Sequence, residues 1–298
     1  MGYEDLNDHD ELRKDPLFGV LAGKLQARRA DCEAVAGKST LNRLELHPRV
    51  GTSVHHKIML DEEAMQRLFV ELFLDSHSQP PAEIVLDLDA TDAPLHGEQE
   101  ERFFHGYYDQ YCYLPLYIFC GRQLLCAKLR AANIDGCAGS IEELERIAGQ
   151  IRARWPQVRI ILRADSGLCR EGLMSWCEGQ GIHYVFGLAR HARLQRSIGA
   201  ELQEALRQGK EIGHSGRLFK ELTYRTRKTW SRSRRVVGKA EATTKGENPR
   251  FIVTSLSVEE YAGKAPYEEF YCARGEMENR IKECQLDMFA ERLSAASA

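Results

Sequence analysis

The middle of the chain alternates between short apolar runs and amphipathic stretches. Runs rich in Val, Ile, Leu and aromatic residues predict five strands, at 83–89, 113–119, 123–130, 159–163 and 183–187. Helical spacing predicts a helix that a Ser140/Glu143 capping box opens and Trp155 ends, and a second helix over 171–178 that stops at Gly179. The order β-β-β-α-β-α-β predicts an α/β fold, a mixed five-stranded sheet flanked by helices.

The regions on either side of this core have other patterns. Asp61 to Asp75 has helical spacing, and the Ser- and Pro-rich stretch 76–81 then breaks the chain. Residues 194–209 look helical, and 217–257 look like strands with polar loops. We therefore expect four parts, which are a helical N-terminal region (1–80), the first part of the core (81–192), a β-rich insertion (193–262) and a C-terminal helix that completes the core (263–298).

Two aspartates come at the ends of predicted strands. Asp89 follows the first strand, and Asp165 follows the fourth and is itself followed by Gly167, which allows a tight turn. In such sheets, ligands gather at the carboxyl ends of strands. Carboxylates at this edge suit a site for two Mg²⁺ ions, which prefer oxygen ligands and promote phosphoryl transfer. Asp87 points to the same face as Asp89 and competes with it for this role, whereas Asp92 fits a turn.

A third acidic candidate lies near the end of the chain. On a helix, Arg274, Glu278 and Lys282 are spaced by four residues and share one face. By itself this spacing is equally typical of a solvated row of ion pairs. Glu278 therefore becomes a site candidate only in combination with other features of the sequence.

Four strings together resemble bacterial insertion-sequence transposases of the DDE type, most closely the group called thirteen-eighty. They are LDLDATD at 86–92, GYYDQYCYLPLY at 106–117, RADSG at 163–167 and YCARGEMENRIK at 271–282. The resemblance extends over nearly the whole chain. It implies a ribonuclease H-like core with a β-rich insertion before the last catalytic helix.

The resemblance also implies an activity and its residues. It implies metal-dependent cleavage at the ends of an insertion sequence and strand transfer into target DNA, with two Mg²⁺ (or Mn²⁺) ions held by Asp89, Asp165 and Glu278. Tyr271 and Arg274 match residues that contact DNA in related groups. Lys282 stands one turn before the place where those groups often carry a lysine, and Gln285 occupies that place here. The implied partners are the terminal inverted repeats, target DNA and a second copy of the chain in a homodimer.

Two further hypotheses remain open. Members of the group are usually longer at both ends, so we expect a truncated copy, and the alternative function is a catalytically inactive DNA-binding remnant. Another ribonuclease H-like nuclease, such as a junction resolvase, is less consistent with the basic insertion and with the Tyr-Arg-Glu arrangement. Metal-dependent nicking of DNA distinguishes an enzyme from a remnant.

The insertion contains a strongly basic segment. Residues 217–239 hold nine Lys or Arg residues against one acid, Glu221, and aromatic residues lie among them. Cations with nearby aromatic surfaces suit contact with DNA, although an exposed hairpin with a solvated face has the same composition. The candidate DNA contacts in this segment are Arg225, Arg227, Lys228, Arg232, Arg234 and Arg235.

Composition limits the remaining possibilities. The 298 residues are 43% hydrophobic and carry a net charge of only -3, which excludes a uniformly basic nucleic-acid binder. Nine scattered cysteines without a C-x-x-C pair predict neither a disulfide framework nor a zinc site. The polar N-terminus and the absence of a long apolar run predict a cytoplasmic, nucleoid-associated protein without a membrane span. Gly37-Lys38 lacks the other glycine of a phosphate-binding loop, and His55 and His56 are expected at the surface.

Overall fold

The computed structural model describes residues 9–23, 35–45, 61–95, 102–212, 215–243 and 246–287. The described residues form two units, one that ends at Met65 and one that begins at Gln66. The first unit contains α1 (His9–Leu12), α2 (Pro16–Leu21) and α3 (Lys38–Glu45). Lys38 forms a 2.9 Å ion pair with Asp10 at the start of α3, and His55 and His56 lie outside the described residues.

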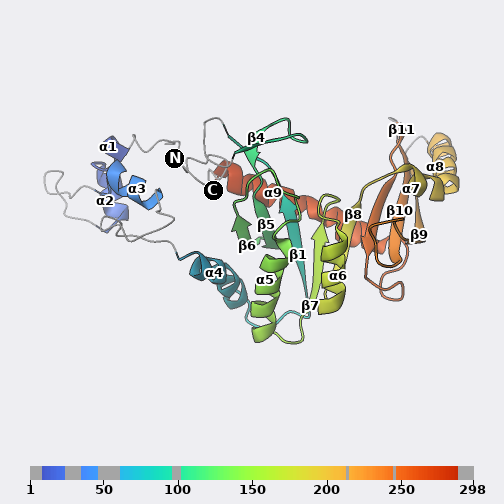
Figure 1. The fold of residues 1–298 in the computed structure, drawn as a ribbon, viewed down its shortest axis with the longest axis horizontal. Coiled ribbons are helices and arrows are strands. Elements are labelled where there is room, and N and C mark those ends of the chain that lie inside the picture. Colours follow the sequence, from blue (N-terminus) through green and yellow to red (C-terminus); the bar gives the residue numbers. More distant parts are fainter. Residues whose placement is uncertain are drawn as a thin grey trace. The chain divides into compact units, whose positions relative to one another are not determined.

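The second unit contains a mixed sheet with the predicted core strands (Figure 1). These are β1 (Glu83–Ala90), β5 (Leu116–Cys120), β6 (Gln123–Lys128), β7 (Arg159–Ala164) and β8 (His183–Leu188). β5 pairs antiparallel with β1 and with β6, while β7 is parallel to both β1 and β8. The spatial order β6-β5-β1-β7-β8 confirms the predicted mixed α/β fold.

The strands of the insertion continue this sheet instead of forming a separate one. β12 (Arg250–Thr254) pairs antiparallel with β8, and β10 (Arg234–Thr243) pairs with β12. β9 (Gly216–Tyr224) and β11 (Gly246–Glu247) both pair with β10. In the described part of the chain the sheet therefore has nine strands, five of them predicted core strands. The apolar pattern predicts strands in the insertion but carries no information about this pairing.

Helices cover both faces of the core sheet (Figure 1). α4 (Glu62–Asp75), α5 (Ser140–Arg154) and α6 (Glu171–Gln180) pack on the face to which Leu86 and Leu88 point. The opposite face receives a C-terminal helical segment made of a π-helical turn (Pro266–Tyr271), a 3₁₀ turn (Cys272–Arg274), α9 (Gly275–Lys282) and a second π-helical turn (Glu283–Asp287). Met277 and Ile281 of α9 pack there against Tyr117 and Phe119 of β5.

The segment predicted as one strand at 113–119 is two strands in different sheets. β4 (Gln110–Tyr113) pairs with β2 (Ala93–Pro94) and β3 (Phe103–His105) in a small sheet, whereas β5 belongs to the large one. Pro115 lies between β4 and β5, where it cannot donate a backbone hydrogen bond. The apolar run at 113–119 therefore does not show that the chain passes from one sheet to the other within it.

Helix ends differ from the predictions in three places. Gly139, at φ 73°, is the N-cap of α5, and Glu143 forms ion pairs with Lys128 and Arg146 in place of a capping box. α6 continues to Gln180 and ends at Gly181, whose φ of 63° favours glycine. The predicted helix 194–209 is divided into α7 (Ala192–Ser197) and α8 (Gly199–Ile212).

Two further properties concern the described residues only. Their eight cysteines are all free thiols. None of their helices has both the length and the apolar composition that crossing a bilayer requires.

Candidate active site

Sheet register brings Asp89 and Asp165 to neighbouring positions. β1 and β7 run parallel, and their last paired residues are Leu88 and Ala164. Asp89 comes next within β1 and Asp165 comes directly after β7, so both lie at the same carboxyl edge of the sheet. Backbone N–H groups of Gly167 and Leu168 donate to Oδ1 of Asp165 at 2.8 and 3.3 Å, which fixes the turn after β7.

A pocket of about 640 Å³ opens at this edge, and all three predicted carboxylates line it. Asp89 and Asp165 come from the sheet, and Glu278 comes from α9, which crosses the opposite face. The pocket is also lined by Arg274, Lys282 and Gln285 of the C-terminal segment and by His105, Tyr107 and Tyr108 of the β3–β4 hairpin. Side chains that are far apart in the sequence therefore share one cavity.

Arg274 joins two of these carboxylates. Its guanidinium lies 3.3 Å from Oδ2 of Asp89 and 2.6 Å from Oε1 of Glu278. The Asp89 and Arg274 side chains are only 16% and 18% exposed, whereas Glu278 is half-exposed. The i,i+4 pair of Arg274 and Glu278 is thus part of the pocket and not of a solvated helix face.

The pocket concentrates negative charge around Asp89. The pKa of Asp89 is raised to about 6, chiefly by burial; Arg274 lowers it, and the carboxylates of Asp165 and Glu278 contribute to the rise. Arg274 alone therefore does not compensate for the burial of Asp89. A further positive charge nearby would therefore stabilise the ionised form of Asp89.

The donor set fits a divalent cation only in part. Asp89 and Asp165 offer carboxylate oxygens, which Mg²⁺ and Mn²⁺ prefer as ligands. Burial disfavours the charged form of Asp89, and Arg274 offsets this only in part. Glu278 is held by Arg274, and no group of three or more His, Cys, Asp or Glu residues in the described part of the chain is arranged to hold a metal ion. The two aspartates therefore fit such an ion directly, and Glu278 fits only if Arg274 releases it.

Asp87 is engaged elsewhere. Although it points to the same face of β1, it is 3% exposed and both of its carboxylate oxygens accept hydrogen bonds from Arg163 of β7. Arg163 also donates to the carbonyl of Phe270 at 2.7 Å. This ion pair connects β1, β7 and the C-terminal segment, and Asp87 does not line the pocket.

The remaining candidates from the C-terminal segment lie near the carboxylates. Lys282 is exposed on the pocket lining, and burial raises the pKa of Tyr271. A Cβ atom at Gly187 would lie 2.5 Å from the Tyr271 hydroxyl, so only glycine leaves room for it there. Gln285 donates to the carbonyl of Asp92 at 3.2 Å, which is a structural contact.

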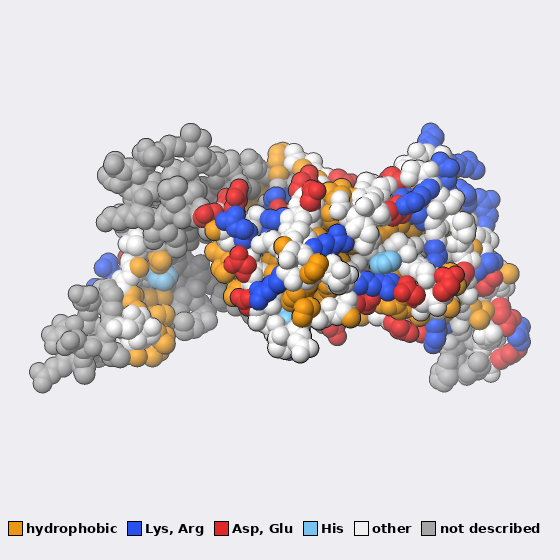
Figure 2. All heavy atoms as spheres, turned by 90° about the horizontal axis from the view of Figure 1, so that it is seen from below, with side chains coloured by type: hydrophobic (Ala, Val, Ile, Leu, Met, Phe, Trp, Pro, Cys, Tyr) orange, Lys and Arg blue, Asp and Glu red, His pale blue; other side chains and the backbone are white. Residues whose placement is uncertain are grey.

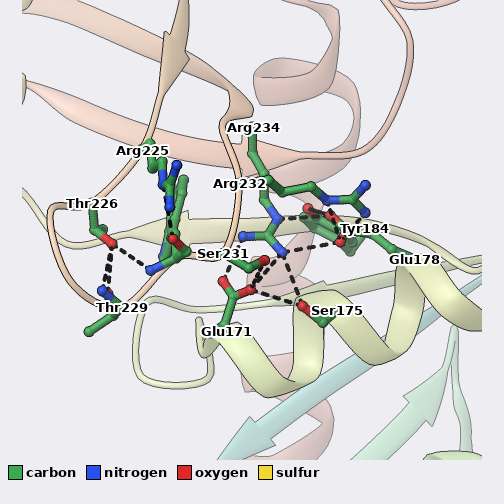
Figure 3. A network of polar contacts seen from close by, with 11 residues as sticks. Glu171, Ser175, Glu178, Tyr184, Arg225, Thr226, Thr229, Ser231, Arg232 and Arg234 are labelled. Atoms are coloured by element: carbon green, nitrogen blue, oxygen red, sulfur yellow. Dashed lines mark hydrogen bonds and ion pairs between the residues drawn. The ribbon is translucent and has the colours of Figure 1, made fainter.

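The basic segment of the insertion folds back onto α6 (Figure 3). Arg234 has a side chain only 2% exposed, with ion pairs of 2.6 Å to Glu171 and 2.8 Å to Glu178. Arg235 is bound by Glu221 and by three backbone carbonyls. The prediction that these two arginines contact DNA is therefore corrected, because their guanidinium groups are occupied within the fold.

The other basic candidates are exposed, namely Arg225, Arg227, Lys228 and Arg232. Arg232 pairs with Glu178, and Arg225 donates to the carbonyl of Trp230 at 3.1 Å. Figure 2 shows acidic and basic side chains intermingled on the face it presents, in keeping with a net charge of -3. The accessible basic side chains among these candidates are therefore those of the exposed loop, and the surface around them is not uniformly basic (Figure 2).

Sequence reasoning missed some residues of this site. Arg163 was part of a quoted string without a role, and its burial beside Asp87 depends on sheet register. Tyr107 and Tyr108 belong to the string at 106–117, but nothing in that string predicts that they line the pocket.

The family model described as transposase DDE domain group 1 matches residues 1–298. The chain belongs to this family. Transposases of the DDE type generally use divalent metal ions.

A structural likeness is found to the piggyBac transposase in a synaptic complex with hairpin DNA, determined by cryo-electron microscopy. The identity is 12% and the TM-score 0.41, with 97% of this chain and 55% of that chain covered. This chain thus spans about half the length of that transposase. A search of curated proteins finds no match.

Proposed function

We propose that this chain is a transposase that cleaves and joins DNA strands at the ends of an insertion sequence. The observation that carries the proposal is that Asp89, Asp165 and Glu278 line one pocket at the carboxyl edge of the sheet. They come from a central strand, its parallel neighbour and a helix on the opposite face. Membership of the transposase DDE domain family supports this chemistry.

Two Mg²⁺ or Mn²⁺ ions, when bound, would supply activation of the attacking water or hydroxyl and stabilisation of the leaving oxygen. Asp89 and Asp165 would hold them with oxygen ligands, and Glu278 would complete the set after Arg274 turns away. Arg274 and Lys282, on one face of the C-terminal segment, would then bind phosphates of the DNA strand, with Tyr271 beside them. The buried Asp87–Arg163 pair keeps the two strands and this segment in register.

The proposed substrates are the terminal inverted repeats of the element and its target DNA. Outside the pocket, the contacts we propose are Arg225, Arg227, Lys228 and Arg232 in the exposed loop of the insertion. Two DNA ends must be joined in one event, so we propose that two copies of the chain assemble on DNA as a homodimer. Such a substrate places the protein at the nucleoid.

The test is cleavage of a duplex that carries the DNA flanking the gene. We expect Mg²⁺- or Mn²⁺-dependent nicks that leave 3′-hydroxyl ends, lost in Asp165→Ala. Asp135→Ala is the matched control, because Asp135 also lines the pocket but is paired with Arg170 at 2.9 Å. Cleavage that persists in Asp165→Ala would overturn the assignment. Salt-sensitive DNA binding without any nicking would instead favour the inactive DNA-binding remnant.

A further inference from the structure

A second pocket, of about 280 Å³, adjoins the carboxyl end of β7. It lies between the ends of β8 and β12, and its lining includes Ser166, Leu188, Arg190, Arg250 and Tyr271. Ser166 also lines the pocket of the three carboxylates. The two cavities therefore adjoin each other at Ser166.

The charge of this second pocket is one-sided. Arg190 and Arg250 are both exposed, and no Asp or Glu is among the lining residues. Among the described residues neither arginine forms an ion pair, whereas Arg234 and Arg235 of neighbouring β10 are both bound by glutamates. Tyr271 adds a hydroxyl that lies close to Gly187. The cavity thus offers two guanidinium groups and a hydroxyl, and no carboxylate lines it.

We propose that this pocket binds a backbone phosphate of the DNA strand that enters the active site. Guanidinium groups bind phosphate oxygens with paired, charge-assisted hydrogen bonds, and a tyrosine hydroxyl can donate another. A strand with one phosphodiester at Asp89 and Asp165 would continue past Ser166 into this cavity. The proposal rests on the proposed function, and it adds Arg190 and Arg250 as positioning residues for the substrate.

The experiment measures salt dependence of binding to a fluorescent DNA duplex by the 298-residue chain, between about 50 and 200 mM salt. Removing one phosphate contact makes the slope of log K against log salt less negative by about 0.9. We expect this change, with roughly tenfold weaker binding, in Arg190→Gln/Arg250→Gln. Arg190→Lys/Arg250→Lys should keep the slope, because it keeps the charge, but lose affinity.

Arg122→Gln is the control, since Arg122 is exposed in the β5–β6 turn at the other end of the strands. If the Gln double variant behaves like Arg122→Gln while its thermal unfolding is unchanged, the phosphate site is wrong. Nicking measured in parallel separates the two proposals. Asp165-dependent nicking with an unaltered salt slope would remove only the phosphate site, and an altered slope without nicking would remove only the transposase activity.

A different observation concerns the hairpin over the active-site pocket. Tyr107, between β3 and β4, is 86% exposed and lines the pocket, and the Tyr108 hydroxyl donates to the carbonyl of Ala90 at 3.3 Å. Tyr108 thereby attaches the hairpin to the strand that carries Asp89. The Tyr107 ring meets the Tyr108 ring edge-on, with 5.0 Å between ring centroids, and stays largely exposed at the rim of the pocket.

We infer that Tyr107 stacks on an unpaired nucleobase next to the cleaved phosphodiester. A base outside the double helix offers a free face, and such stacking is sequence-tolerant. This inference also depends on the proposed function, but it needs neither Arg190 nor Arg250.

The probe is a duplex with one unpaired 2-aminopurine at its end, whose fluorescence falls on stacking. Wild-type chain and Tyr107→Phe should quench it, and Tyr107→Leu should not, all measured without added divalent cation so that cleavage plays no part. Phe104→Leu is the control, because Phe104 is 54% exposed on the same hairpin but outside the pocket lining. Equal quenching by Tyr107→Leu and the wild type would refute the stacking site, whatever the nicking assay shows.

Discussion

Arg163 binds both carboxylate oxygens of Asp87. The pair is buried, so removal of one partner leaves an uncompensated charge inside the protein. We expect Asp87→Asn to lower the free energy of unfolding by about 3–5 kcal/mol in urea titrations. Asp89→Asn should leave stability nearly unchanged or raised, because burial of Asp89 is only partly compensated, and should abolish DNA cleavage. If Asp87→Asn were as stable as the wild type but as inactive in DNA cleavage as Asp89→Asn, Asp87 would belong to the catalytic set.

Arg274 occupies the space between Asp89 and Glu278 that a cation would need. Arg274→Gln should therefore bind Mn²⁺ roughly tenfold more tightly without DNA, because a positive charge a few ångströms away is removed. Electron paramagnetic resonance of free Mn²⁺ measures this affinity directly. Arg280→Gln is the matched control, since Arg280 lies on α9 but pairs with Glu283. Unchanged or weaker Mn²⁺ binding in Arg274→Gln would show that the guanidinium does not compete.

Gly187 allows Tyr271 to reach the sheet. An added Cβ would lie 2.5 Å from the Tyr271 hydroxyl and 2.9 Å from the Ser166 nitrogen. Gly187→Ala should destabilise the fold by about 1–3 kcal/mol, and a second change, Tyr271→Phe, should restore part of that loss. Gly149→Ala provides the contrast, because nothing lies within 4 Å of its Cβ and α5 should gain about 0.5–1 kcal/mol. Similar melting temperatures for Gly187→Ala and the wild type would contradict the close packing.

Glu171 makes the attachment of the insertion to α6 sensitive to acid. Burial raises its pKa, but hydrogen bonds from Arg234 and Ser231 outweigh burial and lower the pKa to about 2. The unfolded-state pKa is higher, so this stabilisation is complete above about pH 4.5 and is lost as pH falls towards 2. Glu171→Gln should be less stable at neutral pH and should lose less stability across that interval.

Urea titrations at a series of pH values measure this difference. Glu142→Gln is the control, because Glu142 also lies in the first turn of a helix and is exposed. Parallel curves for the wild type and Glu171→Gln would mean that the network in Figure 3 does not contribute to acid sensitivity.

Local patterns were sufficient for much of the core. Apolar runs near 83–89, 159–163 and 183–187 became β1, β7 and β8, because buried parallel strands are nearly continuous in hydrophobic residues. The positions of Asp89 and Asp165 directly after such runs were therefore readable without coordinates. Where Pro115 separates two sheets, and where Gly139 replaces a side-chain cap, the same local rules failed because tertiary packing set the element boundaries.

The sequence by itself determined the order of most core strands and helices, the acidic residues at strand ends and the resemblance to DDE transposases. Only the tertiary structure distinguished Asp89 from Asp87, since both share a face of β1 and the difference lies in which side chain meets Arg163. It likewise removed Arg234 and Arg235 from the DNA-binding candidates and attached β12 to β8. These outcomes depend on pairing between distant segments, and hydrogen bonds and ion pairs across strands leave no periodic trace along one chain.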